Sequence, residues 1–185
     1  MGRTIAAWPV LAALLVLGPA AWAGAPIEIK GPLHELEVMG VAAEPRSGAP
    51  VVYLRSKQDR RDLTMFIGPF EAQAIALALE GMRLPRPYTH DLVLEAIHRL
   101  DTKVKRAVIT EMREGTYFAA LVLERQGAEI ILDSRPSDAI ALALRERAPI
   151  LATEAVLAGS RPPAEGAPEK PGGEPPRPGG GTTRL

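Results

Sequence analysis

Residues 133–144 read DSRPSDAIALAL, and this stretch joins a short apolar strand to an apolar helix. The strand is expected at residues 130–132, which places Asp133 at its carboxyl end. The proline suits the first turn of a helix, and Asp138 then faces the positive end of the helix dipole. Two carboxylates and the guanidinium of Arg135 are therefore expected to converge where the strand meets the helix.

Part of this motif has a purely structural explanation. A proline at the first helical position and an acid two residues later satisfy free amide groups and the helix dipole, which is worth roughly 1 kcal/mol without any function. Glu71 follows Pro69 in the same way. Asp133 and Arg135 precede the helix and are not needed as caps, so they could hold a divalent cation or a phosphate. The cluster is either a ligand site or an internal salt-bridged brace.

The other expected elements form a pattern that occurs twice along the chain. Three strands and a helix are expected at residues 33–41, 50–55, 63–67 and 70–82. After a second helix at residues 89–100, the same order returns at residues 104–109, 117–123, 129–132 and 137–145. The hexapeptide AIALAL stands in both repeating helices. This recurrence favours an internal duplication, although Ala-rich helices can also coincide by chance.

The pattern predicts an α+β fold with a mixed, largely antiparallel sheet, built from a duplicated three-strand-plus-helix unit with its helices packed on the sheet. Continuous apolar runs at residues 117–123 and 130–132 predict central strands that are covered on both faces. Three helices can cover one face. The other face needs a loop, the folded-back half of the duplication or another subunit, so we expect a homo-oligomer.

The two ends of the chain differ from this domain in composition. Residues 1–23 have a basic start, an apolar stretch and a small-x-small end at Ala21-Trp22-Ala23, which predicts a signal peptide. The mature protein is then exported, periplasmic or secreted, with no stable membrane span after cleavage; an uncleaved anchor is the weaker interpretation. We expect an extended lead-in at residues 24–30, the folded domain at 31–158 and a disordered tail at 159–185, where 14 of 27 residues are Gly or Pro.

Composition limits the possible chemistry. The 185 residues suit one domain, and the absence of cysteine excludes disulfides and thiolate metal sites. Lys and Arg number 22, as do Asp and Glu, so the chain has no overall basic field. Binding of nucleic acid would therefore need a local patch or a bridging metal cation. Signatures of dinucleotide, P-loop, zinc-protease and serine-hydrolase sites are absent from the sequence.

At the start of the second predicted helix, helix capping does not explain His90. Thr89 is an ordinary N-cap and Asp91 an ordinary first-turn acid. A histidine beside an aspartate can act as general base or metal ligand, but a first-turn histidine is also common as polar surface. With the carboxylates above, the sequence indicates an acidic site of the kind that binds magnesium or manganese.

Three blocks of the sequence carry a family resemblance. They are IGPFEA at residues 67–72, RPYTHDL at 86–92 and DSRPSDAIALA at 133–143. In this order and spacing they resemble the bifunctional nuclease domain family, over about residues 33–157. The resemblance implies an α+β domain, frequently oligomeric, and nuclease activity on RNA and DNA.

These observations predict two alternative functions. The first is an exported, metal-dependent nuclease that hydrolyses phosphodiester bonds of RNA, DNA or both. Its expected roles are metal binding by Asp133, Asp138 and Glu71 with Mg²⁺ or Mn²⁺, activation of water by His90 with Asp91, and stabilisation of phosphate charge by Arg135. The second is a non-catalytic exported module of the same fold that binds a copy of itself or a protein partner.

Overall fold

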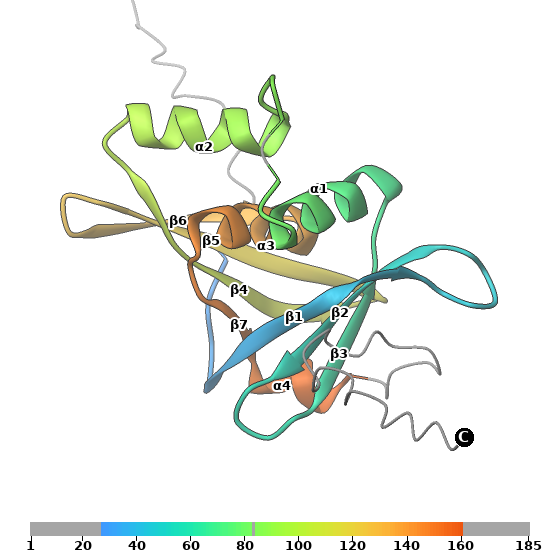
Figure 1. The fold of residues 1–185 in the computed structure, drawn as a ribbon. Coiled ribbons are helices and arrows are strands. Elements are labelled where there is room, and N and C mark those ends of the chain that lie inside the picture. The colour runs from blue at the N-terminus through green and yellow to red at the C-terminus, as the bar shows by residue number, and fades with distance from the viewer. Residues whose placement is uncertain (1–26, 83, 161–185) are drawn as a thin grey trace, which may run out of the picture.

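The computed structural model describes residues 27–82 and 84–160, which form one sheet and four helices (Figure 1). In chain order the elements are β1 (Leu33–Ala43), β2 (Pro50–Ser56), β3 (Asp62–Phe66), α1 (Pro69–Leu79), α2 (Thr89–Arg99), β4 (Lys103–Arg113), β5 (Thr116–Arg125), β6 (Ala128–Ser134), α3 (Pro136–Glu146), β7 (Ile150–Thr153) and α4 (Glu154–Ala158). The predicted signal peptide and almost all of the predicted tail lie outside the described residues. No helix in the described ranges is long and apolar enough to cross a bilayer.

The sheet has seven strands in the order β3-β2-β1-β7-β4-β5-β6. β1 to β3 form one antiparallel meander and β4 to β6 form another. β7 lies between them, antiparallel to β1 and parallel to β4. The predicted α+β fold with a mixed, largely antiparallel sheet is therefore confirmed. Each meander runs outward from β7 and is followed by a helix, the arrangement expected of a duplicated unit.

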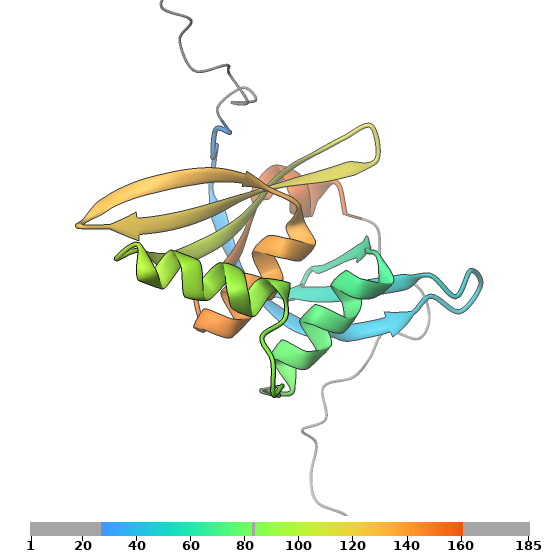
Figure 2. The ribbon, with the colours of Figure 1, turned by 90° about the horizontal axis from the view of Figure 1, so that it is seen from above.

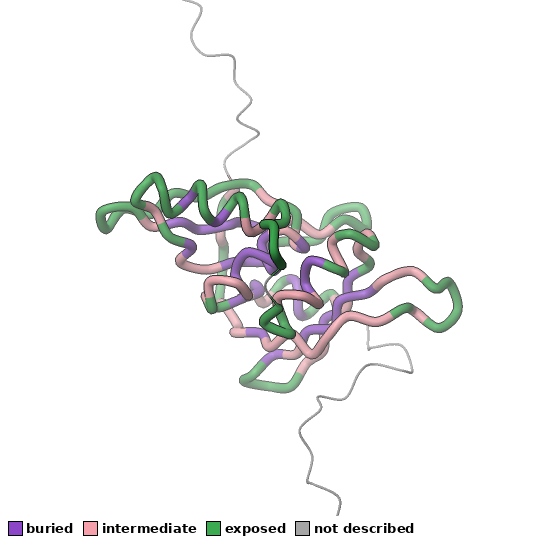
Figure 3. The backbone as a smooth tube through the Cα atoms, turned by 45° about the horizontal axis from the view of Figure 1, so that its top comes forward, coloured by how far each residue is buried: buried purple, intermediate pink, exposed green. Residues whose placement is uncertain are grey.

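Helices α1, α2 and α3 lie together on one face of the sheet, as Figures 1 and 2 show. α3 is the innermost helix and buries five consecutive residues from Ala139 to Ala143. The small alanine side chains let α1 pack closely against it, and Ile75 of α1 and Ile140 of α3 are fully buried. Buried segments run through the sheet and α3 in Figure 3. The repeated AIALAL segments thus lie in the two helices, α1 and α3, that pack against each other.

β6 differs from its prediction. The central position expected for residues 117–123 is correct, since Ala119 to Leu123 of β5 are buried. The same expectation for residues 130–132 is wrong, because β6 is the last strand of the sheet and pairs only with β5. Ile130, Ile131 and Leu132 are 39%, 46% and 41% exposed. A short apolar run does not reveal whether a strand has a second neighbour.

β7 and α4 were not predicted. Both are short, with four and five residues. The buried Thr153 joins them, because its hydroxyl donates to the carbonyl of Thr110 at 2.8 Å and accepts the N–H of Val156 at 3.4 Å as N-cap of α4. The strand that joins the two halves of the sheet is therefore one that periodicity could not reveal.

Candidate functional site

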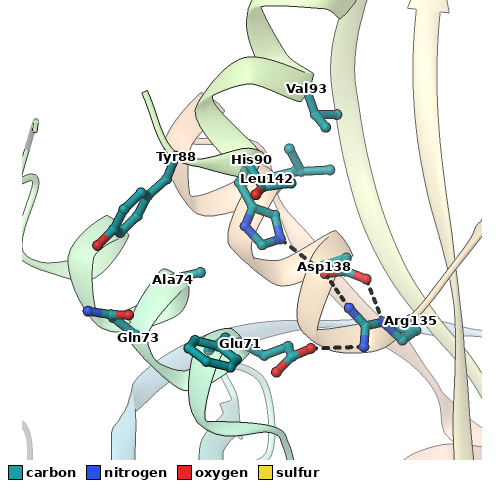
Figure 4. Close-up of a pocket in the computed structure, with 11 residues that line it drawn as sticks. Glu71, Gln73, Ala74, Tyr88, His90, Val93, Arg135, Asp138 and Leu142 are labelled. Carbon is teal, nitrogen blue, oxygen red and sulfur yellow. Dashed lines mark hydrogen bonds and ion pairs between the residues drawn. The ribbon is translucent and has the colours of Figure 1, made fainter. Parts of the chain in front are cut away.

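A cleft of about 690 Å³ lies where the first turns of α1, α2 and α3 meet (Figure 4). α1 and α3 each start with a proline, which fixes the first turn and has no N–H of its own to satisfy. All three helices direct their positive dipole ends to this region, which favours an anionic ligand. The lining residues are Phe70, Glu71, Gln73, Ala74, Tyr88, Thr89, His90, Val93, Arg135, Asp138 and Leu142.

Four of the predicted site residues form a continuous charged chain in this cleft. The guanidinium of Arg135 contacts Glu71 through Nη1, at 2.8 Å from Oε1. It also holds Asp138 with two bonds, from Nε at 2.7 Å and from Nη2 at 3.1 Å. On the other side of Asp138, Nε2 of His90 lies 3.0 Å from Oδ1. The chain of contacts therefore connects α1, the start of α3 and α2.

The charges in this network stabilise one another. Burial alone would raise the pKa of Asp138, but hydrogen bonds from Arg135 and His90 outweigh it, and the net pKa of Asp138 is lowered. The pKa of Arg135 is raised, first by Asp138 and then by Glu71. The Arg135 side chain is nevertheless 65% exposed. Part of the guanidinium is thus accessible to a ligand in the cleft.

His90 has the arrangement of a general base. Because an ionised carboxylate can only accept hydrogen bonds, Asp138 places the imidazole proton on Nε2. The lone pair then lies on Nδ1, which has no hydrogen-bond partner among the residues of the described ranges. Figure 4 shows the ring between Tyr88 and Asp138 on the cleft wall. The geometry can remove a proton from water and stabilise the resulting imidazolium.

Asp91 does not take part in this site, so its predicted pairing with His90 is corrected. Its carboxylate accepts a bond from Nε of Arg145 at 2.7 Å and another from the backbone N–H of Tyr88 at 3.0 Å. Successive side chains on a helix point in directions about 100° apart, so His90 and Asp91 face different neighbours. Asp138 holds the histidine instead.

Asp133 is also outside the cleft. It is exposed on β6 and lies opposite Ala120 of β5. The neighbouring pair, Leu121 with Leu132, is on the helix side of the sheet, where Leu121 belongs to the core. Because side chains alternate along a strand, Asp133 faces away from the helices. The expected convergence of Asp133 with Asp138 is therefore wrong.

The predicted metal ligands do not fit a bound divalent ion. Within residues 27–82 and 84–160, no three acidic or histidine side chains are grouped so that they could hold one. Asp133 faces elsewhere, and Arg135 lies between Glu71 and Asp138 and contacts both. A cation would have to displace this guanidinium from its two carboxylates.

Two cleft residues, Phe70 and Tyr88, and one supporting residue, Arg145, were missed from the sequence. Phe70 and Tyr88 each follow a proline at the entrance to a helix, in a chain with only three Phe and three Tyr. Their position in the sequence could therefore have indicated that they belong to the site. Arg145 gave no such signal, because its partners come from three separate helices.

Comparisons with known proteins point to one family. A family model described as Bifunctional nuclease domain matches residues 52–165, which include every residue that lines the cleft. An uncharacterized protein of Mycobacterium tuberculosis strain H37Rv is 42% identical over 126 residues, or 68% of this chain and 75% of that protein. Bifunctional nuclease 1 of Oryza sativa subsp. japonica is 39% identical over 98 residues, or 50% of this chain and 30% of the rice protein.

Proposed function

The chain belongs to the bifunctional nuclease domain family, and from this premise we propose that it hydrolyses phosphodiester bonds of RNA, DNA or both in the cleft beside His90. The proposal rests on one observation. The accessible Arg135 and His90, which Asp138 holds, line the same cleft. The volume of about 690 Å³ suits a ligand of nucleotide size.

Arg135 would bind the phosphate. Its contacts to Glu71 and Asp138 use one hydrogen on each guanidinium nitrogen, so Nη1 and Nη2 each keep a second N–H. These groups can donate to a non-bridging phosphate oxygen, and the charge opposes the negative charge that grows in the transition state. The paired carboxylates hold the guanidinium in place before substrate arrives.

His90 would activate water. Its Nδ1 takes a proton from the water as the water oxygen bonds to phosphorus, and the bond from phosphorus to the leaving ester oxygen breaks. The leaving oxygen receives a proton from the imidazolium or from solvent. Asp138 stabilises the imidazolium in between, as a carboxylate within 3.0 Å of the ring nitrogen does.

A requirement for Mg²⁺ or Mn²⁺ remains part of the proposal, although no step above uses one. Since the protein carboxylates are paired with Arg135, the ion would be carried by substrate phosphates, as Mg²⁺ often is. Cleavage of an oligonucleotide with Mg²⁺, with Mn²⁺ and with a chelator measures this dependence directly. Undiminished cleavage in chelator would remove the metal from the proposal.

The central test compares two histidines of the same helix. His90→Ala should lower kcat/KM for a fluorogenic oligonucleotide by about 10²- to 10⁴-fold, because the general base is lost. His98→Ala is the matched control, since His98 also contacts a carboxylate of α3, Glu146 at 2.9 Å, but lies outside the cleft. It should retain full activity. Equal activity in both variants would exclude His90 as the base.

The network also supports a second candidate, the non-catalytic module. Arg135 connects α1 with α3 and His90 connects α2 with α3, so these contacts brace the fold whether or not chemistry occurs. On this alternative, purified wild-type protein cleaves neither RNA nor DNA under any metal condition. Asp138→Asn would then lower the melting temperature with no activity to lose.

A further inference from the structure

Two aromatic side chains stand exposed on the cleft wall. Phe70 is 82% exposed and Tyr88 is 41% exposed, and both line the cleft. The chain has only three Phe and three Tyr. Exposed apolar groups gathered at one hollow of a soluble domain are a mark of ligand contact, and core packing gives no reason for them.

Both aromatics lie close to the network of Glu71, Arg135, Asp138 and His90. Phe70 follows Pro69 and immediately precedes Glu71, whereas Tyr88 follows Pro87 and lies two residues before His90. The backbone N–H of Tyr88 donates to Asp91 at 3.0 Å, which anchors this residue at the entrance to α2. In Figure 4 the Tyr88 ring lies on the far side of His90 from Arg135. A group bound between them contacts an aromatic face on one side and a cation on the other.

On the sheet, basic side chains of β4 are paired with carboxylates of β5 and β6. Lys105 contacts Glu124 and Glu129, and Arg106 contacts Glu129 at 2.7 Å. Arg106 and then Lys105 lower the pKa of Glu129 to about 2, so the carboxylate stays charged beside them. With an overall formal charge of zero, long-range attraction of phosphate supplies little affinity. Contacts to the bases have to supply more of it.

We propose that Phe70 and Tyr88 bind nucleobases by stacking, and that the substrate is therefore single-stranded nucleic acid. The inference rests on the proposed function of the same cleft. The faces of paired bases are covered by their neighbours in a duplex, whereas unpaired bases can stack on protein aromatics beside a bound phosphate. A hollow of about 690 Å³ admits a nucleotide but not the width of a double helix.

The experiment measures binding separately from cleavage. A labelled single-stranded oligothymidylate, an abasic oligomer of equal length and charge, and a duplex are titrated against the His90→Ala protein by fluorescence anisotropy. The oligothymidylate should bind about tenfold or more tightly than either of the others, because stacking is lost in both. Phe70→Ala together with Tyr88→Ala in this background should remove the difference between the two single strands.

Phe66→Ala is the matched control for an exposed aromatic. Phe66 is 69% exposed at the end of β3 but does not line the cleft, so this change should leave all three affinities unaltered. Equal binding of the normal and abasic strands, or equal effects of Phe66→Ala and of the double change at Phe70 and Tyr88, would overturn the stacking inference. Histidine-dependent cleavage in the wild type would still support the proposed function in that case. If no oligomer is bound or cleaved, both proposals fail.

Discussion

Arg145 fixes how the three helices around the cleft lie relative to one another. Its side chain is only 11% exposed, and its Nε donates to Asp91 of α2 at 2.7 Å. Its Nη1 donates to the carbonyls of Ala74 in α1 and Ala141 in α3, both at 3.0 Å. One guanidinium thus satisfies acceptors on three helices, and the cleft geometry depends on it.

Loss of Arg145 should destabilise the protein. We expect Arg145→Met to lower the free energy of unfolding by about 2 kcal/mol in urea titrations, since it removes the hydrogen bonds from Arg145 to Asp91 and to two carbonyls. Arg99→Met is the control, because Arg99 contacts Glu95 on the exposed surface of α2 and its loss should cost less than about 0.5 kcal/mol. Equal losses of unfolding free energy in the two variants would show that the contacts of Arg145 stabilise the protein no more than a surface ion pair does.

The same contact has a pH signature. Burial would raise the pKa of Asp91, but Arg145 and the N–H of Tyr88 outweigh it and the net pKa is lowered from its ordinary 3.8. A lowered native pKa stabilises the fold above the ordinary value, and this contribution is lost as the pH falls through the native pKa. The stability difference between wild type and Asp91→Asn should therefore shrink below about pH 4. A difference in stability that does not change with pH would contradict the ion pair between Asp91 and Arg145.

The sequence could place four of the site residues at helix starts, but it could not show which pairs they form, and it wrongly added Asp91 and Asp133. Glu71 and Asp138 each occupy the third position of a helix that begins with proline, so local rules place them at helix starts. The partner of His90 is 48 residues further along the chain. Only the packing of α2 on α3 selects it, and the adjacent Asp91 was therefore the wrong choice.

Among the elements, β6 combines features that a monomer usually avoids. Its outer edge has no neighbouring strand in the described structure, and its three central residues are apolar and exposed. Unpaired backbone groups beside exposed Ile and Leu form a ready surface for another strand. The sequence could reveal the apolar run, but its position at the edge depends on the order of all seven strands.

We expect β6 to pair with β6 of a second copy, which would make the predicted homo-oligomer. Ile131→Lys should convert the oligomer to a monomer in size-exclusion chromatography with light scattering, because a lysine on an edge strand opposes pairing. Met112→Lys on β4 replaces an apolar residue of similar exposure, 45%, away from that edge and should leave the mass unchanged. A wild-type protein that is monomeric at all concentrations would exclude this interface.

The whole molecule combines a nuclease-family domain with two ends of different composition. The described residues include most of the region that the family model matches and place the cleft on the helix side of the sheet. The order and type of the longer elements were predictable, since each has clear periodicity and turn residues. The position of β7 was not, because four residues carry too little pattern and their pairing with β1 joins distant parts of the chain.

Export is a prediction about the whole protein. Expressed from its full reading frame in a bacterium, the protein should be found in the periplasm or medium with Gly24 as its first residue, which mass spectrometry of the purified protein detects. Ala23→Arg should block cleavage, since a small residue is required before the cut. A wild-type chain retained in the cytoplasm with residues 1–23 intact would contradict the signal peptide.

The place of β7 also has a consequence for biosynthesis. The partners of Leu33 and Ala107 in the centre of the sheet are Thr153 and Ile150, which follow both meanders in the chain and are therefore made after them. Each meander can pair its own strands as it emerges, but the two cannot join until that last strand has left the ribosome. The nascent domain thus stays open through most of its synthesis, and closure is a late event with high contact order.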